Sequence, residues 1–351
     1  MGENSAYYRE KARKTREKID AVKKQLPQYT HSFIEECLLK YQINTVYVYV
    51  HDLQMFFTYL QEKNSLCQDR DLKDIPFDVL DSLNAYDINE FQNYLSYGGI
   101  KSRQGEKPRA IARKMTSVRN FFNYMERMDI MDHNPTTKAA KKRKEIENEI
   151  FRLDADEVKQ LIDAVSKVFV KNHHSKVLSE MTAKRDLAII MLLLGTGIRV
   201  SECVGLDIGD VDFRNDGIRI IRKGGSESIV YFGEEVERAL KAWIEERKSI
   251  LPVSGHEQAL FYSTQKKRMG VQAVENMVKK YAREVTTTKK ITPHKLRSTY
   301  GTSLYRETGD IYLVADVLGH KDVNTTKKHY AAMDDNRRRR AAGAVRLRET
   351  P

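Results

Sequence analysis

Six polar residues in the second half of the chain have the types and order needed to handle a phosphate group. Arginine forks can bind a phosphodiester, a tyrosine hydroxyl can attack it, and lysine or histidine can protonate the leaving group, all without a metal. No single residue is informative alone, but their order and spacing together indicate one site. They are Arg199, Lys223, His294, Arg297, His320 and Tyr330.

Arg199 follows Gly195-Thr196-Gly197, where a helix should end and the chain should turn. Glu202 then lies in the first turn of a new helix. This placement lets the guanidinium grip two phosphate oxygens. The alternative is a surface arginine paired with Glu202. The glycines resemble a dinucleotide-binding motif only weakly, since the third glycine and the preceding strand are missing.

The other candidates also lie at predicted element boundaries. Pro293 should start a helix, and the i, i+3 spacing of His294 and Arg297 places both on one helical face. Lys223 lies in a glycine turn between two strand-like runs, where a solubilising charge is the alternative. His320 follows a helix end, and Tyr330 lies in a segment too polar to be core.

Metal and cofactor sites are not predicted. Asp207, Asp210 and Asp212 could suggest a metal cluster, but their setting just before a strand favours turn residues. The isolated pair His173-His174 is predicted to lie in a loop, and no HExxH zinc motif occurs.

Composition points to a polyanionic partner. The 351 residues contain 61 Lys and Arg against 49 Asp and Glu, a net charge of +12. This excess favours nucleic acid over an anionic membrane surface. Three widely spaced cysteines favour a reducing cytosol, and neither a signal peptide nor a membrane-spanning run is evident. A cytoplasmic, nucleoid-associated protein is therefore expected.

Hydrophobic periodicity predicts a helical first domain. Its aromatic residues are expected in the core, and basic residues should cover one face of the last helix and the linker beyond it. Asp87 is the expected N-cap of the third helix. The predicted helices are 30–39, 45–62, a third from Asp87 to Gly98-Gly99, and 110–128; the candidate DNA-binding residues are Arg109, Arg113, Lys114, Arg119, Lys141, Lys142 and Arg143.

The second domain should be mostly helical with a small sheet, so that the whole chain is α+β. Asp154 or Asp156 is the expected cap of its first helix, which runs through Val165. Further helices are predicted at 183–195, 234–250, 271–283, 295–308 and 311–318, with strands at 217–222 and 228–232.

Together, the Arg-x-x-Glu, His-x-x-Arg, Leu-Gly-His and Tyr motifs resemble the tyrosine recombinases, a family of Xer recombinases, phage integrases and conjugative-transposon integrases. The resemblance covers about residues 29–332 and implies a C-shaped clamp around duplex DNA. Composition predicts a basic N-terminal extension (1–28) and a basic linker (136–150). The resemblance adds a helical core-binding, SAM-like domain (29–135), a catalytic domain (151–335) and a C-terminal docking segment (336–351).

The resemblance also implies a role for each site residue. Arg199 and Arg297 would clamp the scissile phosphate, and His320 would donate a hydrogen bond to it. His294 would accept the proton of Tyr330, which becomes a 3′-phosphotyrosine. Lys223 would protonate the departing 5′ oxygen, and Glu202 would support Arg199. The turn reads Arg-Lys-Gly-Gly instead of the common Gly-Lys-Gly.

The implied function is site-specific recombination, most simply the integration and excision of a mobile element. The interval from His320 to Tyr330 is one residue longer than is usual in Xer enzymes and is similar to that of mobile-element integrases. The implied partners are duplex DNA, three further copies in a homo-tetramer and an accessory bending or directionality factor. The alternatives are a Xer-type resolvase, a DNA invertase, a type IB topoisomerase and an inactive DNA-binding regulator.

Overall fold

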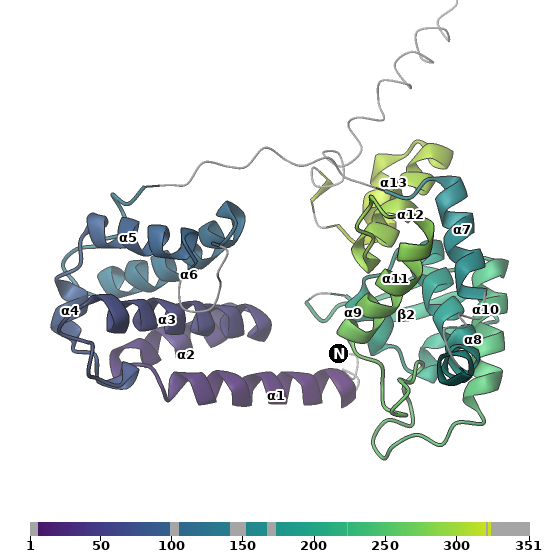
Figure 1. Ribbon diagram of the computed structural model, residues 1–351, viewed down its shortest axis with the longest axis horizontal. Coiled ribbons are helices and arrows are strands. Elements are labelled where there is room, and N and C mark those ends of the chain that lie inside the picture. The colour runs from purple at the N-terminus through teal and green to yellow at the C-terminus, as the bar shows by residue number, and fades with distance from the viewer. Residues whose placement is uncertain are drawn as a thin grey trace, which may run out of the picture. The chain divides into compact units, whose positions relative to one another are not determined.

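In the computed structural model, the chain divides near Asn148 and Glu149 into two compact units. Figure 1 shows the first unit in purple to blue and the second in teal to yellow. The structure describes residues 6–98, 105–140, 152–166, 173–222, 224–320 and 322–323, without the side chains of 173–181.

All regular secondary structure described in the first unit is helical, as predicted. The apolar face of its third helix, including Val46, Val50 and Leu53, is buried at helical spacing. Phe56 packs against Phe91 and Phe122, with ring centroids 5.1 and 5.9 Å apart, so these aromatics are core residues. The helices are α1 (Ala6–Lys23), α2 (His31–Lys40), α3 (Ile43–Lys63), α4 (Phe77–Asp81), α5 (Ala85–Ser96) and α6 (Pro108–Arg127).

The start of α5 corrects the prediction that Asp87 is its N-cap. Asn84 is the cap, and its side-chain oxygen accepts a hydrogen bond from the Tyr86 backbone at 2.8 Å. Asp87 instead reaches back and accepts from the Asn84 backbone at 2.8 Å. The two residues form a reciprocal capping box, so the helix begins ahead of the aspartate.

The N-terminal segment is more than an extension. Ile19 and Val22 at the end of α1, and Leu26 beyond it, are buried in the core of the first unit. The exposed Arg13 pairs with Glu10 and Glu17 on the surface of the same helix. The apolar residues near the end of the predicted extension therefore belong to the packed unit.

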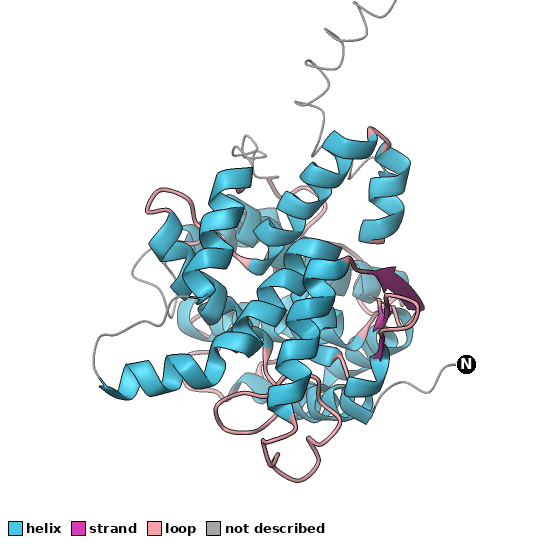
Figure 2. Cartoon of the chain, turned by 90° about the vertical axis from the view of Figure 1, so that its right-hand side faces the viewer, coloured by secondary structure: helices cyan, strands magenta, loops and turns pink. Residues whose placement is uncertain are grey.

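The second unit combines a small three-stranded sheet with helices, which confirms the α+β class; Figure 2 shows the strands in magenta near the edge of the view. The strands are β1 (Val211–Asp212), β2 (Gly217–Ile221) and β3 (Glu227–Tyr231), antiparallel in the order β1-β2-β3. The helices are α7 (Ala155–Ser166), α8 (His173–Thr196), α9 (Val200–Gly205), α10 (Glu234–Arg247), α11 (Val271–Val285), α12 (Pro293–Thr308) and α13 (Ile311–Leu318).

Helix α8 is the central element of this unit and packs against α7, α10 and α12. Ile189, Ile190 and Leu193 of its apolar run are completely buried, as expected for a core helix. No helix among the described residues has the length and apolar character required to cross a membrane.

Two helix starts refine the sequence predictions. Asp154 is the residue that caps α7, because it accepts a hydrogen bond from the Glu157 backbone at 2.8 Å. Glu157 returns the contact by accepting from the Asp154 backbone at 2.9 Å. The prediction of a loop at His173-His174 is wrong, since both residues lie in the first turn of α8. The polar start of that helix lacks the apolar periodicity that marks its buried half.

Candidate active site

A sharp turn after α8 places Arg199. Gly197 has a φ of +64°, which favours glycine, and a Cβ there would lie 2.4 Å from the ring of Tyr300. Close packing and backbone conformation therefore both require glycine at this position. Arg199 follows in an extended conformation immediately before α9, as the sequence predicts.

Glu202 holds Arg199 by two contacts. One carboxylate oxygen accepts from the Arg199 guanidinium at 2.9 Å, and the other accepts from the Arg199 backbone at 2.7 Å. Only 3% of Glu202 is exposed, whereas the side chain of Arg199 is 32% exposed. The predicted ion pair is therefore present, but it orients a guanidinium that still reaches solvent and can accept an anion.

Arg297 extends from α12 into the interior of the unit. It is 3% exposed, and its guanidinium donates to the Gly197 carbonyl at 2.6 Å and to the Leu318 carbonyl. Pro293 is the first residue of α12, as predicted. His294 is exposed, so the two side chains on this helical face differ strongly in burial.

The end of α13 forms a tight corner that positions His320. Gly319 has a φ of +60°, and its N–H donates to the Asp316 carbonyl at 2.8 Å. The His320 N–H donates to the Ala315 carbonyl at 2.9 Å. This pair of contacts is the Schellman arrangement that commonly ends helices. We call residues 317–320 the α13 corner.

The α13 corner is the place where the candidate residues meet. Arg297 contacts its Leu318 carbonyl, and Arg199 donates to its Gly319 carbonyl at 3.4 Å. The structure therefore brings Arg199, Glu202 and Arg297 together with the backbone that carries His320. The segments that carry Arg199 and Arg297 are about a hundred positions apart in the sequence but meet in one small region of the second unit.

A third arginine, which the sequence analysis did not include, completes this region. Arg222 follows β2, and its guanidinium donates to the carbonyls of Val317 at 2.9 Å and Leu318 at 3.2 Å. It also lies 3.9 Å from the Glu202 carboxylate. Burial lowers the pKa of Arg222, while Glu202 opposes that shift. The unusual Arg-Lys-Gly-Gly turn is the sequence feature that could have identified Arg222 as a site residue.

Several predicted residues lie outside the described part of the chain. These include the candidate proton donor and the candidate nucleophile, so their catalytic roles remain predictions. The β2–β3 hairpin itself is confirmed, with Ile221 paired to Glu227 at the end next to the turn. The residues outside the description are Lys223, Tyr330, Lys141, Lys142 and Arg143, together with the C-terminal segment 336–351.

The candidate DNA-binding residues of α6 have different environments. Arg113 donates to both oxygens of buried Asp52, at 2.6 and 2.9 Å, and Lys114 pairs with Glu106 at 3.3 Å. These contacts hold the two cations close to the helix surface. Arg109 is exposed and Arg119 is half-buried. A role of any of the four in DNA binding remains a prediction.

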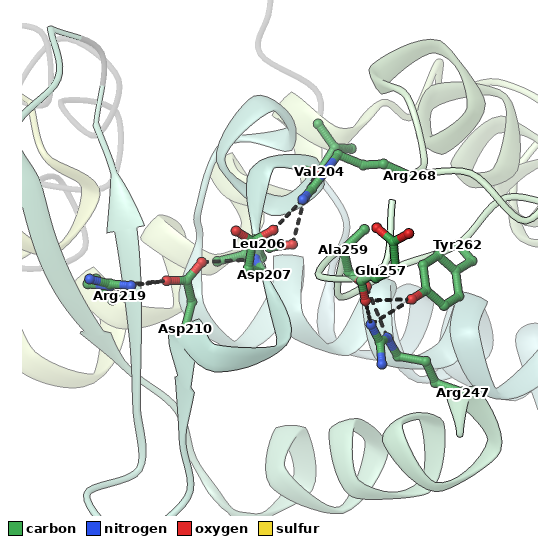
Figure 3. A network of polar contacts seen from close by, with 10 residues as sticks. All are labelled: Val204, Leu206, Asp207, Asp210, Arg219, Arg247, Glu257, Ala259, Tyr262 and Arg268. Carbon is green, nitrogen blue, oxygen red and sulfur yellow. Dashed lines mark hydrogen bonds and ion pairs between the residues drawn. The ribbon is translucent and has the colours of Figure 1, made fainter. Parts of the chain in front are cut away.

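The three aspartates have hydrogen-bonding partners at the start of the sheet, and Asp212 is the last residue of β1 itself. Figure 3 shows Asp207 bound by Arg268 and Asp210 bound by Arg219, the latter at 2.8 Å. Asp212 accepts from the side chain of Asn215 at 2.7 Å, which lowers the pKa of this carboxyl group. Within the described ranges, no group of three or more His, Cys, Asp or Glu side chains is placed to hold a metal ion.

The arrangement gathers Arg199, Arg222 and Arg297 at one corner of a mostly helical unit. The sequence profile of the phage integrase family matches residues 151–337. Tyrosine recombinase XerC of Caldanaerobacter subterraneus subsp. tengcongensis is 32% identical over 84% of this chain and 79% of the relative. Tyrosine recombinase XerS of Streptococcus mutans is 29% identical over 91% of this chain and 96% of the relative.

The fold has known counterparts as well. The XerH site-specific recombinase, solved bound to a palindromic difH substrate, matches with a TM-score of 0.62 at 19% identity, over 86% of this chain and 78% of that chain. The chain belongs to the phage integrase family. It is a tyrosine recombinase, an enzyme of site-specific DNA recombination, as the resemblance implied. This assignment decides against a type IB topoisomerase.

Proposed function

We propose that this recombinase cleaves DNA through a 3′-phosphotyrosine formed by Tyr330. The observation that carries the proposal is the convergence of Arg199 and Arg297 on the α13 corner, with Arg199 partly open to solvent. Two fixed guanidinium groups can stabilise the charge that develops on a phosphate under attack. His320 would donate a further hydrogen bond from the same corner.

The proposed reaction requires neither a metal ion nor an external energy source. The Tyr330 hydroxyl loses its proton to His294, and its oxygen bonds to phosphorus. The bond between phosphorus and the 5′ oxygen breaks, and Lys223 supplies the proton that makes this oxygen a hydroxyl. Rejoining is the reverse reaction with a 5′ hydroxyl of another strand, because the phosphotyrosine retains the phosphodiester linkage.

The DNA would be held by both units, in the clamp that the family resemblance implies. The net charge of +12 supports contacts along the phosphate backbone. Exposed Arg109 is the best-placed predicted contact on α6, because Arg113 and Lys114 already have carboxylate partners. Such an enzyme would act in the cytoplasm at the nucleoid, with any accessory factor bound to neighbouring DNA.

The biological role that we favour is integration and excision of a mobile element. The support is the interval from His320 to Tyr330, which is longer than is usual in Xer enzymes. A Xer-type resolvase is the second candidate, because the relatives named above are XerC and XerS and cover most of the chain. A DNA invertase shares the same chemistry.

Mapping the covalent attachment points on genomic DNA separates these roles. For a mobile-element integrase, trapped adducts should occur at the two ends of one discrete segment and at its excised junction. A resolvase should instead give adducts at a single site in each replicon. An invertase should give adducts at two inverted sites that flank a segment found in both orientations.

A chain ending after Asp335 should bind a half-site normally but should fail to form a complex of four protomers on two DNA sites. The apolar stripe of Ala341, Ala344, Val345 and Leu347 is expected to dock on a neighbouring protomer, as related recombinases pass this segment around a closed ring. Gel-shift and sizing measurements check both steps. Recombination at the full-length rate by the truncated chain would contradict the docking role.

A further inference from the structure

Arg222 connects the β2–β3 hairpin to the α13 corner. Its side chain is 10% exposed, and its two terminal nitrogens donate separately to the Val317 and Leu318 carbonyls. Carbonyls at a helix C-terminus lack partners within the helix and carry partial negative charge. A planar guanidinium fork matches two neighbouring carbonyl acceptors, whereas a lysine ammonium is a single compact charge.

The Arg222 guanidinium lies directly against Gly319. A Cβ on residue 319 would lie 2.8 Å from the central carbon of this guanidinium, so a side chain there would displace the arginine. The φ of +60° at residue 319 also favours glycine. Glycine at this position therefore allows Arg222 to approach the corner closely.

Arg222, Arg199 and Arg297 all bind carbonyls of the same corner. Arg297 shares the Leu318 carbonyl with Arg222, and Arg199 uses the Gly319 carbonyl. Buried Glu202 lies between two of the cations, 2.9 Å from Arg199 and 3.9 Å from Arg222. The hairpin is consequently fixed to the same backbone that the two phosphate-clamping arginines contact.

We propose that Arg222 is a positioning residue for strand cleavage, which fixes the start of the β2–β3 turn and so limits where the next residue, Lys223, can reach. Consecutive Cα atoms are about 3.8 Å apart, so an anchored Arg222 restricts the backbone of its neighbour. This inference rests on the proposed function, in which Lys223 protonates the departing 5′ oxygen. Arg222 itself stays protonated and transfers no proton.

The test uses full-length Arg222→Lys on two suicide substrates, one with the natural 5′ oxygen and one with sulfur at that bridging position. A thiol has a pKa of about 8.5, so a sulfur leaving group departs without a proton donor. Arg222→Lys should cleave the oxygen substrate at least about 10² times more slowly, within the range typical of general acid catalysis. Its rate on the sulfur substrate should approach that of wild type.

Arg219→Lys is the matched control, since Arg219 lies on β2 shortly before Arg222, has a side chain that is 57% exposed and pairs with Asp210. This variant should cleave both substrates at the wild-type rate. Lys223→Ala is the reference for loss of the proton donor. Arg222→Gln, which keeps one N–H donor group, is the second variant if Arg222→Lys does not fold. DNA affinity and thermal unfolding are measured for each.

The outcomes distinguish the positioning role proposed for Arg222 from the proton-donor role proposed for Lys223. If Arg222→Lys is slow on both substrates while Lys223→Ala is rescued by sulfur, Arg222 serves the phosphate clamp or the fold, and the proposal is overturned. Wild-type rates for Arg222→Lys on both substrates also overturn it. If sulfur fails to rescue Lys223→Ala, Lys223 is not the proton donor, and the proposed function is wrong on this point together with the inference built on it.

Discussion

Tyr330→Phe should form no covalent adduct with DNA while binding its site with unchanged affinity. The substitution removes only the hydroxyl oxygen that would bond to phosphorus. A nicked suicide substrate traps the adduct, because the short strand released by cleavage diffuses away. Denaturing electrophoresis in SDS then measures the attached protein directly. Tyr312→Phe is the matched control, since Tyr312 is an exposed tyrosine on α13 and should give adduct at the normal yield.

Two tyrosines in the interior of the second unit, half-buried Tyr300 and buried Tyr281, are poor competitors for this role. Tyr300 packs against Gly197, and burial raises the pKa of its hydroxyl. Tyr281 donates to Asp186 at 2.9 Å, and burial raises its pKa as well. An ordinary tyrosine already has a pKa of about 10 and requires a base to attack, so a further increase is unfavourable. Normal adduct yield from Tyr330→Phe would nevertheless assign the nucleophile elsewhere.

Local signals were sufficient to predict most elements that position the site. Pro293 starts α12, and the glycines near 195–197 end α8, because these residues restrict or permit particular backbone conformations. The β2–β3 hairpin follows from two β-rich runs around a glycine turn. Each signal acts within a few residues, which is the range over which sequence patterns are informative.

Contacts between distant segments could not be predicted in the same way. Asp52 and Arg113 are 61 positions apart, and each alone has the character of an ordinary charged helix residue. Arg222 contacts carbonyl groups, which every residue possesses, so no side-chain pattern marks its partners. The sequence pattern placed the N-cap of α5 at Asp87 instead of Asn84, because Asn and Asp are both good N-caps. Only the residue at which the helix begins distinguishes the cap from its partner in the capping box.

Arg199→Lys should reduce the rate of strand cleavage by about 10²–10³, the usual cost of removing one preorganised donor to a transition state. Lysine retains the positive charge but cannot form two parallel contacts with neighbouring oxygens. It would also lose the geometry in which Glu202 holds one nitrogen at 2.9 Å while the rest of the group reaches solvent. Single-turnover cleavage on a suicide substrate measures the effect.

The affinity of Arg199→Lys for DNA decides how its loss of cleavage rate is interpreted. An arginine that acts in the transition state should change the cleavage rate far more than the equilibrium binding of the half-site. Arg214→Lys, at an exposed position in the loop before β2, is the control and should leave both quantities unchanged. If affinity falls in parallel with cleavage in Arg199→Lys, Arg199 is an ordinary backbone contact, and Arg297 becomes the principal phosphate ligand of the site.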